Sequence, residues 1–110
     1  MIAVIFEVTP SADGHAEYLQ RAGQLAPLLA GVDGFISVER FSSLTQPGKL
    51  LSLSFWRDEA AVRAWCRQEE HRAAQQAGRG GVFDSYRLRV ASVIRDYGMH
   101  DRAQAPAGAP

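Results

Sequence analysis

Residues 50–66 read LLSLSFWRDEAAVRAWC, and within this stretch a strand-like segment passes directly into a helix-like one. Residues 50–56 are apolar, aromatic or small, a composition that favours an extended strand over residues 50–57. Asp58 is a good helix N-cap, because its carboxylate can accept hydrogen bonds from the first-turn amides. Trp65 then follows Val62 at helical spacing. The stretch therefore predicts a strand that ends at a sharp junction with a helix.

The rest of the chain supplies one more helix and three more strands. Apolar residues recur at helical spacing between residues 18 and 29, and Pro27 within that pattern predicts a bend. Strand-like segments are predicted at residues 2–8, 35–44 and 83–97. The order strand, helix, strand, strand, helix, strand is that of the split βαβ, ferredoxin-like fold. We therefore expect an α+β protein with a four-stranded antiparallel sheet.

The domain organisation follows from length and composition. A chain of 110 residues is long enough for one core and too short for two. Residues 1–98 are expected to form the ferredoxin-like domain. Residues 99–110 are rich in Ala, Gly and Pro, and we expect a disordered tail.

One face of the predicted sheet is left without helices. Ile36, Val38 and Leu44 are expected on that open face, and a large exposed apolar face is rare in a soluble monomer. A second copy of the chain is expected to cover it, which makes a homodimer through the open sheet face and a dimeric α/β barrel. A monomer with an exposed apolar face is the alternative.

Charge and cysteine content exclude several classes of function. Twelve Lys plus Arg balance twelve Asp plus Glu, so no broad positive field is available for nucleic acid or anionic lipid. Cys66 is the only cysteine, which fits a cytoplasmic protein, and no Cys/His spacing suggests a metal site. The apolar run at residues 1–8 is interrupted at Glu7, so a strand is expected there rather than a membrane segment.

Three short segments resemble the antibiotic biosynthesis monooxygenase domain family, within the dimeric α/β barrel superfamily. They are Gly34-Phe35 opening the second strand, Ser54-Phe55-Trp56-Arg57-Asp58 leading into the helix with Trp65, and Arg95-Asp96-Tyr97-Gly98 closing the last strand. The resemblance covers about residues 2–98. It implies the predicted fold, and it joins the chain to cofactor-independent oxygenases, haem-degrading enzymes and proteins without established activity.

The two enzymatic branches of the family differ in their key positions. Haem degradation is disfavoured, because Glu7 and Gln75 stand where that branch has an asparagine and a histidine, and glutamine is a poor iron ligand. The quinone-forming branch looks closer. A deprotonated phenolic substrate supplies the electrons there, so no cofactor is expected, and the protein orients the substrate and stabilises charge. Ala61 departs from this branch, which has an asparagine one turn before the tryptophan.

The resemblance nominates five site residues. Trp65 and His71 are the predicted catalytic pair: the indole offers a flat wall and an N–H, and the imidazole can accept a phenolic proton near neutral pH. Tyr86, Arg79 and Phe83 are predicted to bind the small aromatic substrate. The predicted function is a cofactor-independent monooxygenase that oxidises a small aromatic or quinol substrate with molecular oxygen.

Each of these residues also has a structural interpretation. Trp65 shares an apolar helical face with Val62 and Cys66 and fits a core position. His71 falls on the solvent side of an ideal helix, so a catalytic His71 requires a helix break before it. Whether the protein is an enzyme is therefore open. The alternative is a non-catalytic dimeric α/β barrel that binds a small ligand or has a structural or stress role.

Overall fold

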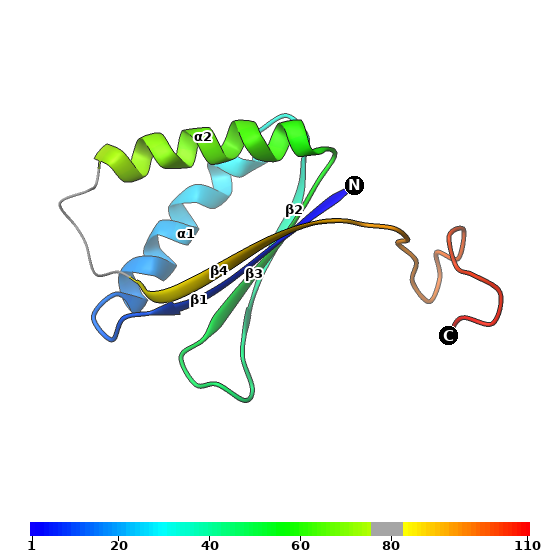
Figure 1. The fold of residues 1–110 in the computed structure, drawn as a ribbon, viewed down its shortest axis with the longest axis horizontal. Helices are drawn as coiled ribbons and strands as arrows, with labels where there is room; N and C mark the ends of the chain where they lie inside the picture. Colours follow the sequence, from blue (N-terminus) through cyan, green and yellow to red (C-terminus); the bar gives the residue numbers. More distant parts are fainter. Residues whose placement is uncertain (76–82) are drawn as a thin grey trace.

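The computed structural model describes residues 1–75 and 83–110, and it describes their side chains except at residues 69–75. Four strands, β1 (Ile2–Pro10), β2 (Phe35–Ser42), β3 (Leu50–Trp56) and β4 (Phe83–Ser92), form one sheet in the order β2-β3-β1-β4. All neighbouring strands are antiparallel. Helices α1 (His15–Ala30) and α2 (Glu59–Gln75) lie on one side of the sheet (Figure 1). The ferredoxin-like α+β prediction is confirmed.

The side of the sheet that faces the helices holds the core. Leu29 of α1 and Val62 of α2 form one buried cluster with Trp56 of β3. Val8 of β1 and Tyr18 of α1 form a second one. Because side chains alternate between faces along a strand, these contacts fix which residues of every strand point toward the helices.

The open face carries different residues from those predicted. Val38 packs against the core on the helix side, and Leu44 lies in the β2–β3 hairpin, fully exposed. Ile36 lies where the β2–β3 register shifts, between Phe35 and Ser37. The expectation of these three residues on the open face was thus wrong for Val38 and Leu44. The large apolar residues of β1, β2 and β3 that alternate away from the helices are Ile5 of β1, Phe41 of β2, and Leu51, Leu53 and Phe55 of β3.

Several element boundaries also differ from prediction. Strand β4 ends at Ser92 rather than at Tyr97, and residues 93–110 contain no helix or strand. Helix α1 continues through Pro27 to Ala30. Helix α2 runs without interruption from Glu59 to Gln75, so the proposed break before His71 is not there. Within residues 1–75 and 83–110, neither helix is long and apolar enough to cross a membrane.

The junction between β3 and α2 is held by a compact polar contact. Asp58 Oδ1 accepts the Ala61 N–H at 2.9 Å, which confirms the predicted cap of α2. The Arg57 guanidinium makes two parallel hydrogen bonds of 3.0 Å to the Asp33 carboxylate at the α1–β2 turn. Gly34 lies beneath this pair with a positive φ of 85°. The start of α2 is thus fixed to the turn that precedes β2.

Acid should weaken this junction in a defined pH range. The hydrogen bonds from Arg57 lower the pKa of Asp33 below its ordinary value of 3.8. A lowered pKa in the folded state means that the stabilisation is fully present above the ordinary value and is lost as pH falls through the folded-state value. The free energy of unfolding of the wild-type protein, measured in urea, should therefore fall as the pH is lowered below about 4.

The matched variant for this prediction is Arg57→Gln, which removes the charged partner of Asp33. Asp58 keeps its hydrogen bond from the Ala61 amide, the largest cause of its own lowered pKa. The variant should show a smaller loss of stability between pH 4 and pH 2 than wild type. Equal losses in the two proteins would show that the Arg57–Asp33 contact does not contribute to acid sensitivity.

Candidate functional site

Two aromatic clusters lie on the helix side of the sheet, at its opposite ends. The first consists of Phe35, Trp56 and Trp65. The ring of Trp56 lies 5.3 Å from that of Phe35 and 6.4 Å from that of Trp65, centroid to centroid. Trp56 is buried, and its Nε1–H donates to Ser54 Oγ at 2.9 Å. This cluster joins α2 to β2 and β3 and is well packed.

The second cluster consists of Phe6, Tyr18, Phe83 and Tyr86. The Phe83 ring lies 5.8 Å from Tyr18, 6.1 Å from Phe6 and 6.2 Å from Tyr86, centroid to centroid. Its members come from β1, α1 and β4, so it joins segments that are distant in sequence. Tyr18 is buried, whereas Phe83 and Tyr86 are exposed. The second cluster is therefore open on its β4 side.

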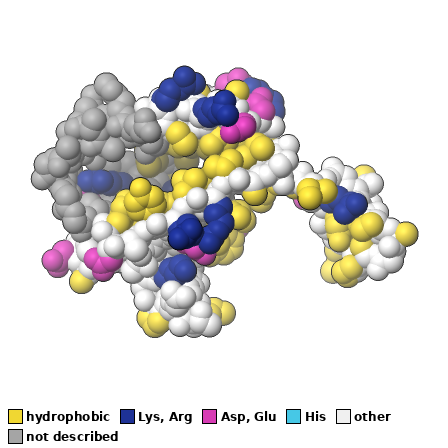
Figure 2. Space-filling model, in the orientation of Figure 1, with side chains coloured by type: hydrophobic (Ala, Val, Ile, Leu, Met, Phe, Trp, Pro, Cys, Tyr) yellow, Lys and Arg dark blue, Asp and Glu magenta, His cyan; other side chains and the backbone are white. Residues whose placement is uncertain are grey.

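An exposed apolar strip on β4 lies beside this open cluster. Tyr86, Leu88 and Val90 pair with Val8, Phe6 and Val4 of β1, so their side chains face the helices. They nevertheless remain 66%, 46% and 47% exposed. Hydrophobic side chains gather between β4 and α2 in Figure 2. We call Tyr86, Leu88 and Val90 the β4 strip.

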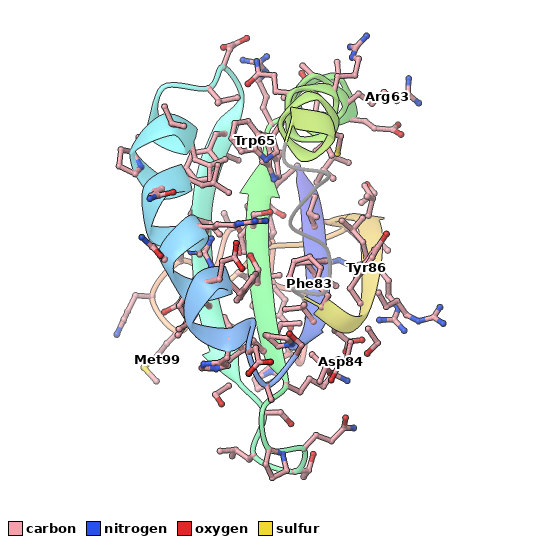
Figure 3. The ribbon with its side chains drawn as sticks, turned by 90° about the vertical axis from the view of Figure 1, so that its left-hand side faces the viewer. Arg63, Trp65, Phe83, Asp84, Tyr86 and Met99 are labelled. Atoms are coloured by element: carbon pink, nitrogen blue, oxygen red, sulfur yellow. The ribbon has the colours of Figure 1, made fainter. Side chains whose placement is uncertain are left out.

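The direction of α2 explains why the β4 strip is uncovered. In Figure 3 the sheet is seen broadside while α2 is seen nearly end-on, so the helix leans away from the sheet instead of lying along it. Trp65, near the start of α2, still reaches the core. A helix rises about 1.5 Å per residue, so His71 is about 9 Å further along α2 than Trp65. The exposed residues of the β4 strip thus lie on the face of β4 that is turned toward the helices.

The structure brings together some of the predicted site residues and separates others. Phe83 and Tyr86 share the open cluster, whereas Trp65 belongs to the packed one (Figure 3). The structural interpretation of Trp65 as a core residue therefore describes its contacts well. The side chain of His71 lies outside the described residues, although its backbone lies in α2. Arg79 also lies outside them.

Two other observations correct details of the sequence interpretation. Cys66 is exposed, not a small buried residue of the apolar face. Glu7 alternates away from the helices and accepts a hydrogen bond from Arg89 at 3.0 Å on the open face, which lowers its pKa. Glu7 is therefore not beside Trp65, as a site residue of the first strand would be.

Ala61, which replaces the asparagine of the quinone-forming branch, has a packing role. It is buried, and its Cβ lies opposite Gly34, where a built Cβ would approach it to 2.6 Å. A larger side chain at position 61 has no room against this turn. Among the side chains that the structure describes, no group of three His, Cys, Asp or Glu residues is arranged to hold a metal ion.

A separate depression of about 290 Å³ lies next to the β2–β3 hairpin. Its lining includes Phe41 and Leu51 together with the charged Glu7 and Lys49. Lys49 Nζ lies 3.8 Å from Glu7 Oε1, so the charges in the depression largely neutralise each other. Phe41, Leu51 and Glu7 belong to the open face, on the far side of the sheet from the β4 strip.

Sequence analysis missed two members of the open cluster, Phe6 and Tyr18. Both were assigned to regular elements and to no site. Phe6 reaches the cluster through the register of β1 with β4, which sets it opposite Leu88, and Tyr18 reaches it through the packing of α1 on the sheet. Local periodicity encodes neither.

Comparison with known proteins agrees with this architecture. The sequence model of the family described as antibiotic biosynthesis monooxygenase matches residues 1–77. The chain is 48% identical over 93 residues to a protein named jasmonate monooxygenase from Pyricularia oryzae, covering 84% of this chain and 43% of that protein. It is 34% identical over 93 residues to the uncharacterised protein YqjZ of Bacillus subtilis, covering 84% and 79% respectively. The chain thus spans less than half of the first relative and most of the second.

A solved structure supports the fold at lower sequence identity. The cofactor-independent oxygenase SnoaB from Streptomyces nogalater superposes with a TM-score of 0.69 at 15% identity, covering 86% of this chain and 94% of that one. Similarity at this level of identity shows the fold alone. With the sequence match over residues 1–77 and the two relatives above 30% identity, the chain belongs to the antibiotic biosynthesis monooxygenase family.

Proposed function

We propose that the protein is a monooxygenase that oxidises a small apolar substrate held on the β4 strip, between β4 and α2. The observation that carries the proposal is the exposure of Tyr86, Leu88 and Val90 on the face that otherwise holds the core. Small-molecule sites are mostly apolar, with a few polar groups that fix orientation. The Tyr86 hydroxyl is one such group on the strip.

The chemistry we propose needs no cofactor when the substrate is a phenol or a quinol. The deprotonated substrate transfers electrons to O₂, and a C–O bond forms at the activated carbon. Loss of water from the resulting hydroperoxide then gives a quinone. One oxygen atom ends in the product and one in water, and the substrate supplies all four electrons. The protein orients the anion and accepts a proton.

The proposed roles of the site residues follow their positions. Phe83 and Tyr86 form the aromatic wall against which a flat substrate stacks. Trp65 supports the start of α2 and closes the far end of the site. Arg79 remains a proposal as the anion-binding group, made from the sequence. His71 is not retained as the proton acceptor, because that role required a break before it in α2, and α2 is continuous from Glu59 to Gln75. SnoaB, named as a cofactor-independent oxygenase on the same fold, supports this class of chemistry.

A second substrate class is suggested by the relative from Pyricularia oryzae, which is named a jasmonate monooxygenase. A small, largely apolar carboxylic acid also suits an apolar strip. Without a phenol or quinol group, however, such a substrate cannot supply all four electrons for the cofactor-independent reaction, so its oxygenation needs an external reductant. The non-catalytic alternative is a barrel that binds either class of ligand and consumes no oxygen.

Oxygen uptake with a substrate panel separates these possibilities. Hydroquinones, hydroxyanthracenes and jasmonic acid should be tested with and without NADPH, for wild type, His71→Ala and His15→Ala. His15 is an exposed histidine at the start of α1 and serves as the control. We expect uptake with a quinol in the absence of NADPH, and wild-type rates in both His71→Ala and His15→Ala, because the break in α2 that a catalytic His71 requires is absent.

Other outcomes of the panel have definite meanings. Uptake with jasmonic acid only, in the presence of NADPH, would replace the quinol with the second substrate class. Binding without uptake above autoxidation would favour the non-catalytic barrel. A large fall in His71→Ala, with His15→Ala unchanged, would return His71 to the mechanism as the proton acceptor.

We further propose that a second copy of the chain covers the open sheet face. Ile5, Leu51, Leu53 and Phe55 form a row of apolar side chains across the two central strands of this face. Facing sheets pack about 10 Å apart through such residues. The dimer leaves the β4 strip free, because the strip lies on the opposite face.

A further inference from the structure

The chain contains two Asp-Gly steps, Asp13-Gly14 and Asp33-Gly34, and no asparagine. An aspartate that precedes glycine is prone to form isoaspartate, because glycine has no side chain to obstruct attack by its amide nitrogen. That nitrogen attacks the side-chain carboxyl carbon, a C–N bond forms, and water is lost to give a succinimide. Water then opens the ring at the main-chain carbonyl, which leaves the backbone running through the side-chain carbonyl. The reaction needs no oxidant or reductant.

The Asp33-Gly34 step is held by one residue, Arg57, at the junction of β3 and α2. The Arg57 guanidinium donates to both carboxylate oxygens of Asp33 at 3.0 Å, and the Arg57 backbone N–H donates to the Gly34 carbonyl at 2.7 Å. We call these three hydrogen bonds the Arg57 clamp. Attack by the Gly34 nitrogen requires the Asp33 carboxyl to turn toward its own backbone, which breaks the two parallel bonds.

The charge of Arg57 acts in the same direction as the clamp. A carboxyl group loses its oxygen to the incoming nitrogen more readily when it is protonated than when it is ionised. The guanidinium favours the ionised form of Asp33, and the pKa of this carboxyl is lowered accordingly. Both geometry and charge therefore oppose succinimide formation at Asp33.

The Asp13-Gly14 step has no comparable restraint. Asp13 is an exposed residue in the turn between β1 and α1, and within residues 1–75 and 83–110 its carboxylate has no ion-pair partner. The Gly14 N–H donates to the Ser11 carbonyl at 2.9 Å, so this one turn has to open before the nitrogen can attack. Such openings have a low free-energy cost next to a helix end, where the backbone frays.

We propose that Asp13, and not Asp33, is the site at which this chain forms isoaspartate, and that the Arg57 clamp blocks the reaction at Asp33. Exposure does not account for the difference, because the Asp33 side chain is itself 89% exposed. An isoaspartate adds one carbon to the backbone path. At Asp13 it lengthens the turn that leads into α1, the helix that carries Tyr18 of the open cluster. The proposal does not depend on the proposed oxygenation.

Ageing of the folded protein at neutral pH, followed by peptide mapping, tests the proposal. Trypsin places Asp13 in the peptide 1–21 and Asp33 in the peptide 22–40, with one aspartate in each. Isoaspartate in each peptide is measured by enzymatic methylation with labelled S-adenosylmethionine. It should accumulate at Asp13 at least about fivefold faster than at Asp33, the factor that corresponds to an exposed, two-bond ion pair. The two peptides aged free in solution should react at similar rates, because neither retains the fold.

Three variants test the role of the clamp. Arg57→Gln should raise the rate at Asp33 by about fivefold and leave the rate at Asp13 unchanged. Arg57→Lys keeps the charge but loses the paired hydrogen bonds, so it should also raise the rate at Asp33, by less. Gly48→Ala is the control for a general loss of stability, because Gly48 lies in the β2–β3 hairpin with a φ of 84°. It should keep the wild-type rates at both sites.

The opposite results are equally definite. Isoaspartate that forms at Asp33 as fast as at Asp13 in the folded wild type, or that does not form at Asp13, would overturn the proposal. An Arg57→Gln variant in which Asp33 reacts no faster than in wild type would overturn the role of the clamp. The same would follow if Gly48→Ala raised the rate at Asp33 as much as Arg57→Gln, because general unfolding would then explain both. Arg57→Lys decides the matter if Arg57→Gln does not fold.

Discussion

Replacing Gly34 with alanine should lower the free energy of unfolding by about 3 kcal/mol, the largest loss of stability that we expect from any single methyl group here. Gly34 has a φ of 85°, a left-handed conformation that costs an L-residue about 1 to 2 kcal/mol. The added Cβ would also lie 2.6 Å from the Ala61 Cβ. Overpacking of that kind costs about 1 to 3 kcal/mol. A thermal midpoint lower by at least about 10 °C is expected.

Gly48→Ala separates the two causes. Gly48 has nearly the same φ, 84°, but nothing lies within 4 Å of a built Cβ there. The free energy of unfolding of Gly48→Ala should fall by only about 1 to 2 kcal/mol, the cost of the left-handed backbone conformation alone. Adding Ala61→Gly to Gly34→Ala removes the steric contact and should restore part of the loss. Equal losses in Gly34→Ala and Gly48→Ala would contradict the tight contact between the β2 turn and α2.

Replacing Leu88 with aspartate should reduce kcat/KM for the substrate found in the oxygen-uptake panel by about 100-fold. Leu88 is the central residue of the β4 strip. In the Leu88→Asp variant, an apolar substrate bound on the strip would bury the new carboxylate without a partner. The side chain is half-exposed on an edge strand in the free protein, so the folded state itself should change little in stability. The effect should appear mainly in KM, because the interaction is made in the ground state as well.

Leu44→Asp is the matched control for this prediction. Leu44 is a fully exposed leucine in the β2–β3 hairpin, away from the strip. Its variant should keep the wild-type kcat/KM. Wild-type kinetics in Leu88→Asp, with both variants folded, would move the substrate to another surface of the protein.

The sequence predicted those features of the fold that depend on local patterns. The strand-to-helix junction at Asp58 followed from capping chemistry, and the structure shows the predicted hydrogen bond to the Ala61 amide. The order of elements gave the sheet topology, because few topologies suit that order. Boundaries were less accurate, and β4 stops at Ser92, five residues before the predicted end.

The assignment of β2 residues to faces failed for a specific reason. Strict alternation set Ile36 and Val38 together on the open face. The shift of register between Phe35 and Ser37 breaks the alternation, so Phe35 and Val38 both pack on the helix side. An extra residue of this kind reverses the face toward which every side chain on one side of it points. Strand β2 contains no proline or glycine that would mark the position of the extra residue.

The sequence anticipated part of the open aromatic cluster, and the substrate-binding role of its members stays a prediction. Tyr86 and Phe83 were named as substrate-binding residues and do lie together, but their partners Phe6 and Tyr18 come from β1 and α1. Such a cluster depends on strand register and helix docking, which are long-range features. The exposure of the β4 strip depends on the direction in which α2 leaves the sheet, and no periodicity in its sequence encodes that direction.

The most direct test of the account is methyl NMR of the protein with an active quinol under anaerobic conditions, where binding occurs and turnover does not. The proposed site predicts that the methyl signals of Leu88 and Val90 shift as substrate is added. The methyl signals of Leu51 and Leu53, which lie on the open face, should not shift. Shifts confined to Leu51 and Leu53 would contradict the account, because they would put the substrate on the face that we assign to the second copy.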